Sequence, residues 1–530
     1  MIDESLTPQT PDADAVPDAA SADHPRDRGA GRTAALVSLR VMRGLAGTAA
    51  AAATILAVGL VAPPQLGVEP RGVTVEPQPA ELSVACTGAL LRLGDETGAH
   101  ADEAFAVGEP TLSTAASGSP DRTAVDTGDV AGASPSQAPA SLTLRPGDGA
   151  ALGAAQSQAV AGDGDLAGLA ATVCAEPSSS AWLVGGAMSL GRTTLLVLVN
   201  PTGVAAEVSV QMWGETGEVS APGMDGIGVP AHGRRVLSLA GFAPGLASPV
   251  VHVEARGGQV LAALQTSAMR VLDPGGVDVI AAGAAPARDV VVPAVRIFDG
   301  AGVAESLGLE GYGDLDAIVR VANPGIESAH VEVSIAPTDP AGLGSAFELE
   351  IPGGRVLDTP LAAGLPLGAA PLADGSYTVT LRSDQPIVGA VRTATIPLPE
   401  GAEGTGGEAG AETTEPRAGA ADLAWFPAAP ALRGTVAVAV AEGPAPVLVA
   451  VSIDGAAHDL TLEALGGGTD IRLPVPASGA VELTLEAGAA YRLDRSSGIA
   501  AALSFAGESA IAGYPLVAPR RGDSPIVVRP

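Results

Sequence analysis

The run Thr194–Pro201, TLLVLVNP, returns later in the chain as Ala317–Pro324, AIVRVANP. Asn200 and Asn323, the only asparagines in the chain, hold the same place in the two runs, and each precedes a proline. Both runs are followed by alternating apolar and polar residues, as at 207–212 in the first copy. A period of two is typical of half-buried antiparallel strands. The two runs therefore predict a repeated β unit.

A third copy lacks the asparagine. It opens with Ala424–Phe426, runs through Thr435–Val440 into a Gly-Pro turn, and has its alternating valines at Val447–Ile453. Each copy ends with two apolar stretches joined by a polar loop, which we interpret as a hairpin. Short strands without an amphipathic helix predict an all-β fold of tandem immunoglobulin-like β-sandwiches. The alternative is a larger continuous β-solenoid, because a three-bladed propeller is geometrically implausible.

The repeats divide the chain into segments. They are a disordered cytoplasmic tail at 1–43, a transmembrane helix or signal anchor at 44–62, an N-terminal β region at 63–180 with a low-complexity insertion at 108–167, β-sandwiches at 181–287, 288–398 and 421–519, an acidic flexible linker at 399–420, and a C-terminal tail at 520–530. The insertion and the linker are predicted from composition, since both are rich in small and acidic residues and lack periodicity.

The segment Leu45–Ala62 has 18 residues without a charge. As a helix it is roughly 27 Å long, which matches the hydrocarbon core of a bilayer. Arginines at 26, 28, 32, 40 and 43 precede it, and this predicts a cytoplasmic N-terminus with the bulk of the chain outside. We expect a single-pass plasma-membrane protein that contacts the bilayer through this segment. The alternative is a cleaved signal peptide and a secreted protein.

The two cysteines, Cys86 and Cys174, both lie in strand-like runs on the predicted outer side. An even count in an oxidising compartment favours a disulfide. Closing a loop of this length stabilises a fold by about 4 kcal/mol in the chain-entropy model. Two free buried thiols are the alternative, and the absence of a C-x-x-C motif argues against redox catalysis.

The charge balance excludes one class of partner. The formal net charge is −31, every basic residue is arginine, and aromatic residues make up 2% of the chain. A nucleic-acid-binding protein needs a basic face and stacking side chains. We therefore predict no nucleic-acid partner.

Catalytic motifs are missing from the sequence, which has no G-x-S-x-G elbow, Walker loop or H-E-x-x-H. We predict no enzyme and identify no catalytic, cofactor-binding or metal-binding residues. A candidate binding surface has two parts. Glu310, Asp314 and Asp316 surround a glycine-rich loop where carboxylates ligate calcium, with solvated acids as the alternative. Trp213 falls on the polar side of its strand, which predicts an exposed aromatic at a sugar or protein contact, with a covered edge residue as the alternative.

The motifs Trp182–Gly186, WLVGG, and Leu198–Pro201, LVNP, accompany the arginine-flanked anchor and the paired cysteines. In this combination the chain resembles, over residues 70–520, an uncharacterised actinobacterial family of membrane-anchored β-sandwich envelope proteins, domain-of-unknown-function family number 5719. The resemblance implies a place near envelope glycosyltransferases and no established activity.

We therefore expect a non-enzymatic cell-envelope scaffold or interaction module that assists polysaccharide assembly or export. An envelope glycosyltransferase or a wall polymer is the expected partner. The alternative is a carbohydrate-binding or glycan-modifying envelope protein that acts through surface acidic residues.

Overall fold

The computed structural model describes residues 73–75, 81–94, 103–145, 147, 149–270, 273–309, 311–342, 344–365, 372–397, 421–494, 496–519 and 526–528. The chain forms two compact bodies. In the smaller one, residues 1–75 and 527–530, strand β1 (Val73–Val75) pairs with β35 (Ile526–Val528). The predicted anchor Leu45–Ala62 and the linker 399–420 lie outside the described residues. Within the described part, no helix has the length and apolar character needed to cross a membrane.

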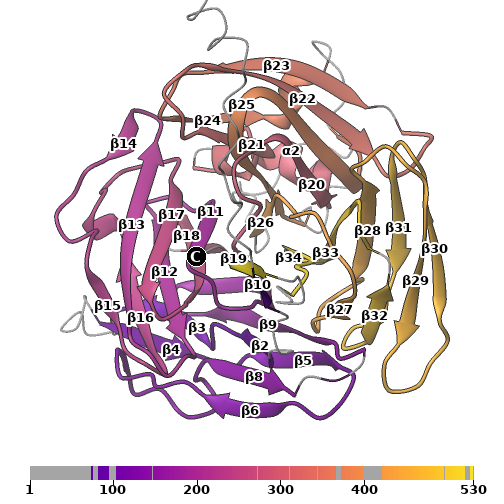
Figure 1. Ribbon diagram of the computed structural model, residues 1–530. Coiled ribbons are helices and arrows are strands. Elements are labelled where there is room, and N and C mark those ends of the chain that lie inside the picture. The colour runs from indigo at the N-terminus through magenta and orange to yellow at the C-terminus, as the bar shows by residue number, and fades with distance from the viewer. Residues whose placement is uncertain are drawn as a thin grey trace, which may run out of the picture. The chain divides into compact units, whose positions relative to one another are not determined.

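The larger body, residues 76–526, is all-β and consists of four lobes around a central axis (Figure 1). Lobe N contains β2 (Leu82–Ala85), β3 (Leu90–Leu93), β4 (Ala104–Val107), β5 (Thr111–Ala116), β6 (Asp121–Ala124), β7 (Val130–Ala131), β8 (Ala140–Leu144), β9 (Leu152–Asp163) and β10 (Leu166–Cys174). Lobe 1 contains β11 (Ser180–Val184), β12 (Arg192–Asn200), β13 (Ala206–Gly214), β14 (Gly217–Val219), β15 (Ile227–Val229), β16 (Gly233–Ser238), β17 (Val250–Gly257), β18 (Leu261–Arg270) and β19 (Asp273–Ala281).

Lobes 2 and 3 complete the ring. Lobe 2 contains β20 (Ala287–Ile297), α2 (Gly300–Ser306), β21 (Ile318–Asn323), β22 (Ala329–Pro337), β23 (Ser345–Ile351), β24 (Arg355–Pro360), β25 (Gly375–Thr395) and β26 (Asp422–Pro427). Lobe 3 contains β27 (Val436–Ala439), β28 (Val447–Ser452), β29 (His458–Ala464), β30 (Ile471–Val475), β31 (Ala480–Thr484), β32 (Ala490–Asp494), β33 (Ile499–Gly507) and β34 (Ala510–Pro515). Short 3₁₀ turns lie at Leu239–Gly241, Gly313–Leu315 and Leu361–Gly364.

Lobes 1, 2 and 3 share one plan of two antiparallel sheets. In lobe 1 the sheets are β11-β17-β13-β14 and β16-β12-β18-β19, and in lobe 3 they are β27-β32-β29-β30 and β31-β28-β33-β34. In lobe 2 the long strand β25 belongs to both sheets, since its first half pairs with β20 and β22 and its second half with β21 and β26. The repeated β unit predicted from the sequence is therefore present.

The predicted hairpin at the end of each repeat is wrong. Strand β17 pairs with β11 and β13, whereas the next strand, β18, pairs with β12 and β19. The loop between β17 and β18 thus crosses from one sheet to the other.

The two asparagines make the same turn in lobes 1 and 2. The Asn200 side-chain amide donates to the carbonyl oxygen of Val204 at 2.8 Å, and the Asn323 amide donates to that of Glu327 at 2.6 Å. Each asparagine Oδ1 accepts the backbone N–H two residues later, at 3.0 Å. In lobe 3, Ser452 takes this place and its hydroxyl donates to the fourth residue on, at 2.7 Å.

The third repeat was predicted one strand out of step. Ala424–Phe426 lies in β26 and pairs with β25 of lobe 2, so it ends that lobe and does not open the next. Val447–Ser452 is β28, which has the place of β12 in the sheet order. The turn after β28 is closed by a serine and not by an asparagine. The Gly-Pro sequence before β28 was therefore mistaken for the counterpart of the two Asn-Pro turns.

The predicted low-complexity insertion at 108–167 is also wrong, because this segment forms β5 to β9. Its many small residues permit close packing between lobes. A Cβ atom added at Gly153 of β9 would lie 2.6 Å from the carbonyl oxygen of Ala437 in lobe 3. Lobe N and lobe 3 share a hydrophobic cluster that includes Ala155, Leu169 and Phe505. Lobe N therefore closes the ring that three repeats alone leave open.

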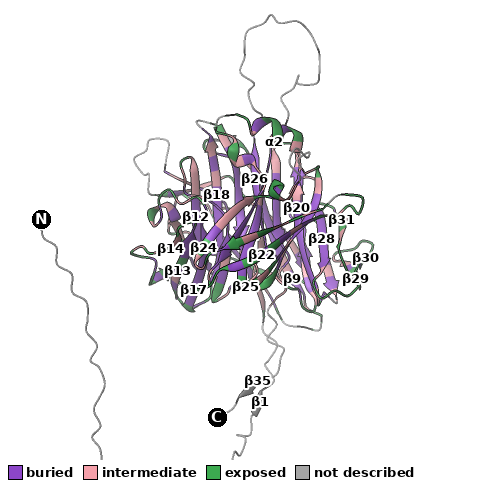
Figure 2. Ribbon diagram, turned by 90° about the horizontal axis from the view of Figure 1, so that it is seen from above, coloured by how far each residue is buried: buried purple, intermediate pink, exposed green. Residues whose placement is uncertain are grey.

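One strand from each lobe lies along the axis: β10, β19, β26 and β34 (Figure 1). Each of β10 and β26 contacts both β19 and β34. All four begin at one end of the axis, where residues at their starts line one cleft. We call this end the mouth and the opposite end the base. Figure 2 shows buried residues along the strands and exposed residues in the loops at these ends.

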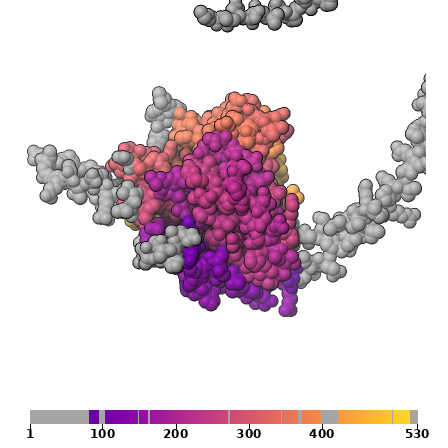
Figure 3. Space-filling view, turned by 90° about the vertical axis from the view of Figure 1, so that its left-hand side faces the viewer, coloured from indigo at the N-terminus to yellow at the C-terminus, as the bar shows by residue number. Residues whose placement is uncertain are grey.

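The predicted disulfide between Cys86 and Cys174 is present and lies at the base end of lobe N. It links the end of the inner strand β10 to the residue after β2. Val84 and Cys174 line a small cavity together with Leu516–Pro519, which follow β34. The described chain therefore enters and leaves the larger body at the base. Figure 3 shows lobe 1 between lobe N and lobe 2.

Candidate functional site

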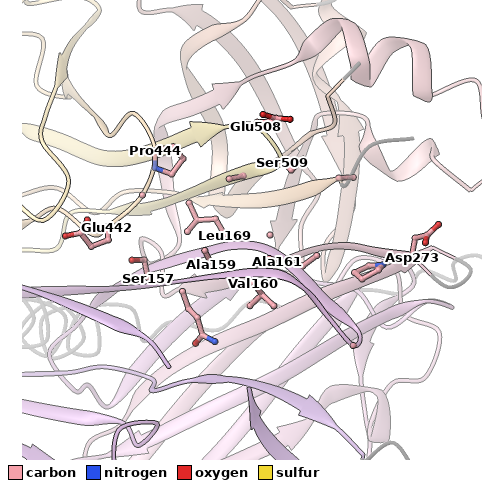
Figure 4. Close-up of a pocket in the computed structure, with 18 of the residues that line it drawn as sticks. Ser157, Ala159, Val160, Ala161, Leu169, Asp273, Glu442, Pro444, Glu508 and Ser509 are labelled. Atoms are coloured by element: carbon pink, nitrogen blue, oxygen red, sulfur yellow. The ribbon is translucent and has the colours of Figure 1, made fainter. Parts of the chain in front are cut away.

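A cleft of about 1240 Å³ lies at the mouth of the larger body. Its walls are the β9–β10 hairpin on one side and, on the other, the turn at Glu442–Pro444 and the β33–β34 hairpin with Glu508 and Ser509 (Figure 4). Asp273, at the start of β19, lies at one end of the cleft (Figure 4). The four lobes converge here, so the cleft exists only when the ring is closed.

The lining of the cleft is acidic and hydroxylated. Four exposed carboxylates line it, Glu109, Asp273, Glu442 and Glu508. Thr111, Ser157, Ser509 and Tyr312, which carry hydroxyl groups, also line it, whereas the amide of Gln158 is hydrogen-bonded to the backbone of Leu90 and Val107. The one arginine in the lining, Arg270, is buried and already hydrogen-bonded to Asp314. The cleft therefore has a negative field and suits a ligand that presents cationic or hydroxyl groups.

Asp422 lies beneath the cleft and binds all four inner strands. It is the first residue of β26, and its side chain is fully buried. Its Oδ2 accepts the backbone N–H groups of Leu169 in β10 and Ile511 in β34, both at 2.9 Å. Its Oδ1 accepts those of Val277 in β19, at 3.3 Å, and Leu423 in β26, at 2.9 Å. One carboxylate thus replaces the strand pairing that is missing at the centre of the ring.

A glycine makes room for this carboxylate. Gly168 in β10 has φ +119°, and a Cβ atom there would lie 2.1 Å from Oδ1 of Asp422. Gly276 in β19 has φ +122°, and a Cβ atom added there would lie 2.7 Å from the backbone nitrogen of Leu423. A side chain at either position would separate the inner strands.

A second carboxylate, Asp278 in β19, lies on the same axis and is also fully buried. It accepts the backbone N–H of Trp425 in β26 at 2.8 Å. Burial raises the pKa of Asp422 to about 7, while its four backbone hydrogen bonds oppose the rise. Burial raises the pKa of Asp278 well above its usual range, against the hydrogen bond from Trp425, and the charge of Asp422 adds to the rise.

The predicted acidic loop has a different role from the one expected. Asp314 accepts hydrogen bonds from Arg270 at 2.7 and 3.1 Å and is also paired with Arg192. Burial alone would raise the pKa of Asp314, but the bonds and charges of Arg270, Arg192 and Arg392 outweigh burial and lower it. The interpretation of Asp314 as a free calcium ligand or a solvated acid is therefore wrong.

Its predicted neighbours do not complete a site. The backbone carbonyl of Asp316 accepts a hydrogen bond from Arg392 at 3.2 Å, and burial raises the pKa of the Asp316 carboxyl. Glu310 lies outside the described residues. Among the residues that the structure does describe, no three His, Cys, Asp or Glu side chains form a group that would hold a metal ion.

Arg320 is the buried link between lobes 1 and 2. Its guanidinium donates to both carboxylate oxygens of Asp358 at 2.7 Å. It also donates to the carbonyl oxygens of Gly186 and Pro249 in lobe 1, at 2.8 and 3.1 Å. The guanidinium carbon lies 4.5 Å from the centroid of the Trp425 ring. Charge, hydrogen bonds and a π face thus all act on one cation.

Trp213 is not the exposed aromatic that its strand position predicted, since it is 7% exposed. Its ring stacks on Trp182 with centroids 5.3 Å apart, and Trp182 stacks on His252 at 4.3 Å. The His252 ring nitrogens are hydrogen-bonded to Ser180 and Gln211. The alternative, a covered residue, describes Trp213 correctly.

The axial carboxylates and Arg320 were not among the residues predicted from the sequence. A signal was present for two of them, because Asp278 lies inside VDVI and Arg320 inside IVRV. A single charge in an otherwise apolar strand indicates a buried and partnered group. Asp422 follows the acidic linker in the sequence, which hid it.

Comparisons with known proteins add a family and little else. None of the curated proteins matches this chain significantly. A solved structure, the crystal structure of Thermotoga maritima 1070, matches with 19% identity over 22% of this chain and 85% of its own length, at a TM-score of 0.17. Such a score carries no argument about fold or function. The model of the Family of unknown function (DUF5719) matches residues 130–490, which is most of the chain and spans parts of all four lobes, so the chain belongs to this family.

Proposed function

We propose that this protein is a non-enzymatic binding scaffold of the cell envelope whose ligand site is the cleft at the mouth. The observation that carries the proposal is the convergence of four lobes on one cleft lined by four exposed carboxylates. A ligand with cationic groups, such as a basic segment of an envelope protein, is complementary to this lining.

The carboxylates differ from a catalytic arrangement in their exposure. Each of the four is exposed to solvent at the rim. The carboxyls with strongly raised pKa values, Asp278 and Asp422, are buried away from the rim, and all their described hydrogen bonds come from backbone N–H groups. Catalytic acids are usually partly buried groups with shifted pKa values inside the cleft itself. This separation supports binding over turnover.

A titration of the full chain with an oligolysine peptide tests the site. The double variant Glu442→Gln and Glu508→Gln should weaken binding about tenfold, because each charge contributes about 0.7 kcal/mol across 6 Å of water. The matched control is Glu348→Gln with Glu350→Gln, two exposed acids on β23. Equal affinity of both variants and the unsubstituted chain contradicts the proposal.

Hydroxyl groups in the lining favour a second candidate, a wall or capsule polysaccharide. Thr111, Ser509 and Tyr312 line the cleft and carry hydroxyl groups, which are neutral donors and acceptors of the kind that binds sugars. A neutral oligoglucan in the same titration separates the two ligands. If the Glu442→Gln and Glu508→Gln variant still binds the glucan but no longer binds oligolysine, the glucan is bound by the hydroxyl groups and oligolysine by the carboxylates.

The envelope location rests on residues before the larger body. We propose that Leu45–Ala62 holds the chain in the plasma membrane with its C-terminal bulk outside, near an envelope glycosyltransferase or wall polymer. The disulfide supports an oxidising compartment. Reporter fusions after residues 40 and 180 should lie in opposite compartments. Crosslinking in whole cells followed by purification of the chain should recover the partner.

A further inference from the structure

The base of the larger body presents an exposed aliphatic side chain on the same turn of three lobes. The turn is the one that follows β12, β21 and β28 and is closed by Asn200, Asn323 and Ser452. Val204, Ile326 and Ile453 lie on these turns and are 58%, 98% and 41% exposed. The described residues contain only two other exposed large hydrophobic side chains, Leu190 and Leu309.

The sheet registers place all three turns at the base. In lobe 1, β12 is antiparallel to β18, and β18 is antiparallel to the inner strand β19. Strand β12 therefore runs in the direction of β19, from mouth to base, and its turn lies at the base. The same sheet order holds in lobes 2 and 3. Leu190 precedes β12 and so lies at the mouth.

We infer that the base rests on a lipid bilayer, with Val204, Ile326 and Ile453 inserted at its surface. The inference rests on the proposed anchor, and the position of the chain ends supports it. Only 18 residues, 63–80, connect the apolar segment to Glu81, and they span at most about 60 Å. Because the chain enters the larger body at the base, this tether holds the base toward the membrane.

Charge explains why the contact is apolar. A chain with a net charge of −31 is repelled by an anionic lipid surface. Aliphatic side chains bind a bilayer by leaving water, and this does not depend on lipid charge. Three widely separated contacts would also fix the direction of the axis, so that the cleft at the mouth points away from the membrane.

Quenching by nitroxide lipids tests the contact. The full chain, carrying Ser328→Cys labelled with a fluorophore next to Ile326, is reconstituted into phosphatidylcholine vesicles. The native cysteines are joined in the disulfide and do not take the label. We expect strong quenching that high salt does not remove. Val204→Ser, Ile326→Ser and Ile453→Ser together should lower it to the level of a label at Leu190→Cys, whereas Leu190→Ser should leave it unchanged.

Two results would overturn the inference. They are equal quenching of the triple variant and the parent, or quenching of the Ser328→Cys label no stronger than that of the Leu190→Cys label. Loss of the chain from vesicles on alkaline extraction contradicts the anchor instead. In that event the same labelled variants, mixed with vesicles from outside, still report whether the base binds lipid.

Discussion

The axis contains fully buried carboxylates and the interface between lobes 1 and 2 contains partly buried ones, and the two regions stabilise these groups in opposite ways. On the axis, Asp422 and Asp278 accept only backbone N–H groups. At the interface, Asp314 and Asp358 are bound by arginine guanidinium groups. The pKa of Asp422 is consequently raised to about 7 and that of Asp314 is lowered.

This difference shows that hydrogen-bond number alone does not set the charge of a buried acid. Asp422 makes four hydrogen bonds, yet burial dominates because no cation lies among its partners. Asp314 is only partly buried and has two arginines beside it. The axis therefore holds strands together through directional bonds, whereas the interface holds lobes together through charge.

The largest expected effect is that of Asp422→Asn. The amide nitrogen would face two of the four N–H groups that now bind a carboxylate, and each buried N–H left without an acceptor costs about 1–3 kcal/mol. We expect the free energy of unfolding at pH 8 to fall by about 4 kcal/mol. Urea denaturation followed by near-ultraviolet circular dichroism measures it. A variant as stable as the parent would show that the inner strands do not need this carboxylate.

Replacing Arg320, the cation between lobes 1 and 2, is expected to lower the free energy of unfolding somewhat less. Arg320→Met keeps much of the volume but leaves Asp358 without a cation, while the hydrogen bond from the Ser248 hydroxyl remains. The Asp358 side chain is 25% exposed and so partly solvated. The expected loss is about 3 kcal/mol, at the lower limit for breaking a buried ion pair. The same denaturation experiment applies. Asp358→Asn combined with Arg320→Met should recover part of the loss, and no recovery would assign the cost to packing around Trp425.

The pH dependence separates the two regions. A carboxyl whose pKa is raised on folding binds more protons in the folded state, so the free energy of unfolding falls as pH rises from about 4 to 7. From pH 5 to pH 8 we expect a loss of about 3 kcal/mol from Asp422, and Asp278 adds to it. Asp314, whose pKa is lowered, stabilises the fold above about pH 4, and this contribution is lost as the pH falls further. Denaturation across this range in the parent and in Asp422→Asn should show a flatter profile in the variant.

The smallest expected effect is that of a substitution in an uncharged turn. Its loss in the free energy of unfolding is a reference for the larger losses. Asn323→Ser keeps a donor for Glu327, as Ser452 does in lobe 3, but loses the bond to the carbonyl oxygen of Ile351. We expect a loss of about 1 kcal/mol, the contribution of one hydrogen bond. Asn200→Ser in lobe 1 is the matched variant and should show the same loss. A loss several times larger in one lobe would contradict the equivalence of the two turns.

Local patterns in the sequence predicted the strands well. The alternation after Asn200 and Asn323 correctly indicated β13 and β22, and the two cysteines were correctly paired. The alternation depends only on neighbouring residues, and two cysteines can pair in only one way. Both features can therefore be predicted from one sequence. The Ser452 turn was missed because a serine is common, whereas asparagine is confined to the two turns.

The ring and its axis were beyond the same reasoning. Closure depends on the small residues of β9 packing against lobe 3, and those residues have the composition of a disordered segment. The cleft likewise combines Glu109, Asp273, Glu442 and Glu508 from three lobes. Their proximity follows from tertiary structure alone, and no spacing in the chain reveals it.

The order of the lobes also has a consequence for how the chain is made. Strand β34 is the last inner strand to be synthesised, and it must meet β10, one of the first, before Asp422 has all four of its donors. Contacts between such distant parts of a chain form slowly. A nascent or truncated chain without the β33–β34 hairpin therefore has an open ring and no complete cleft. Binding at the mouth thus reports that the chain has been synthesised through β34 and that the ring has closed.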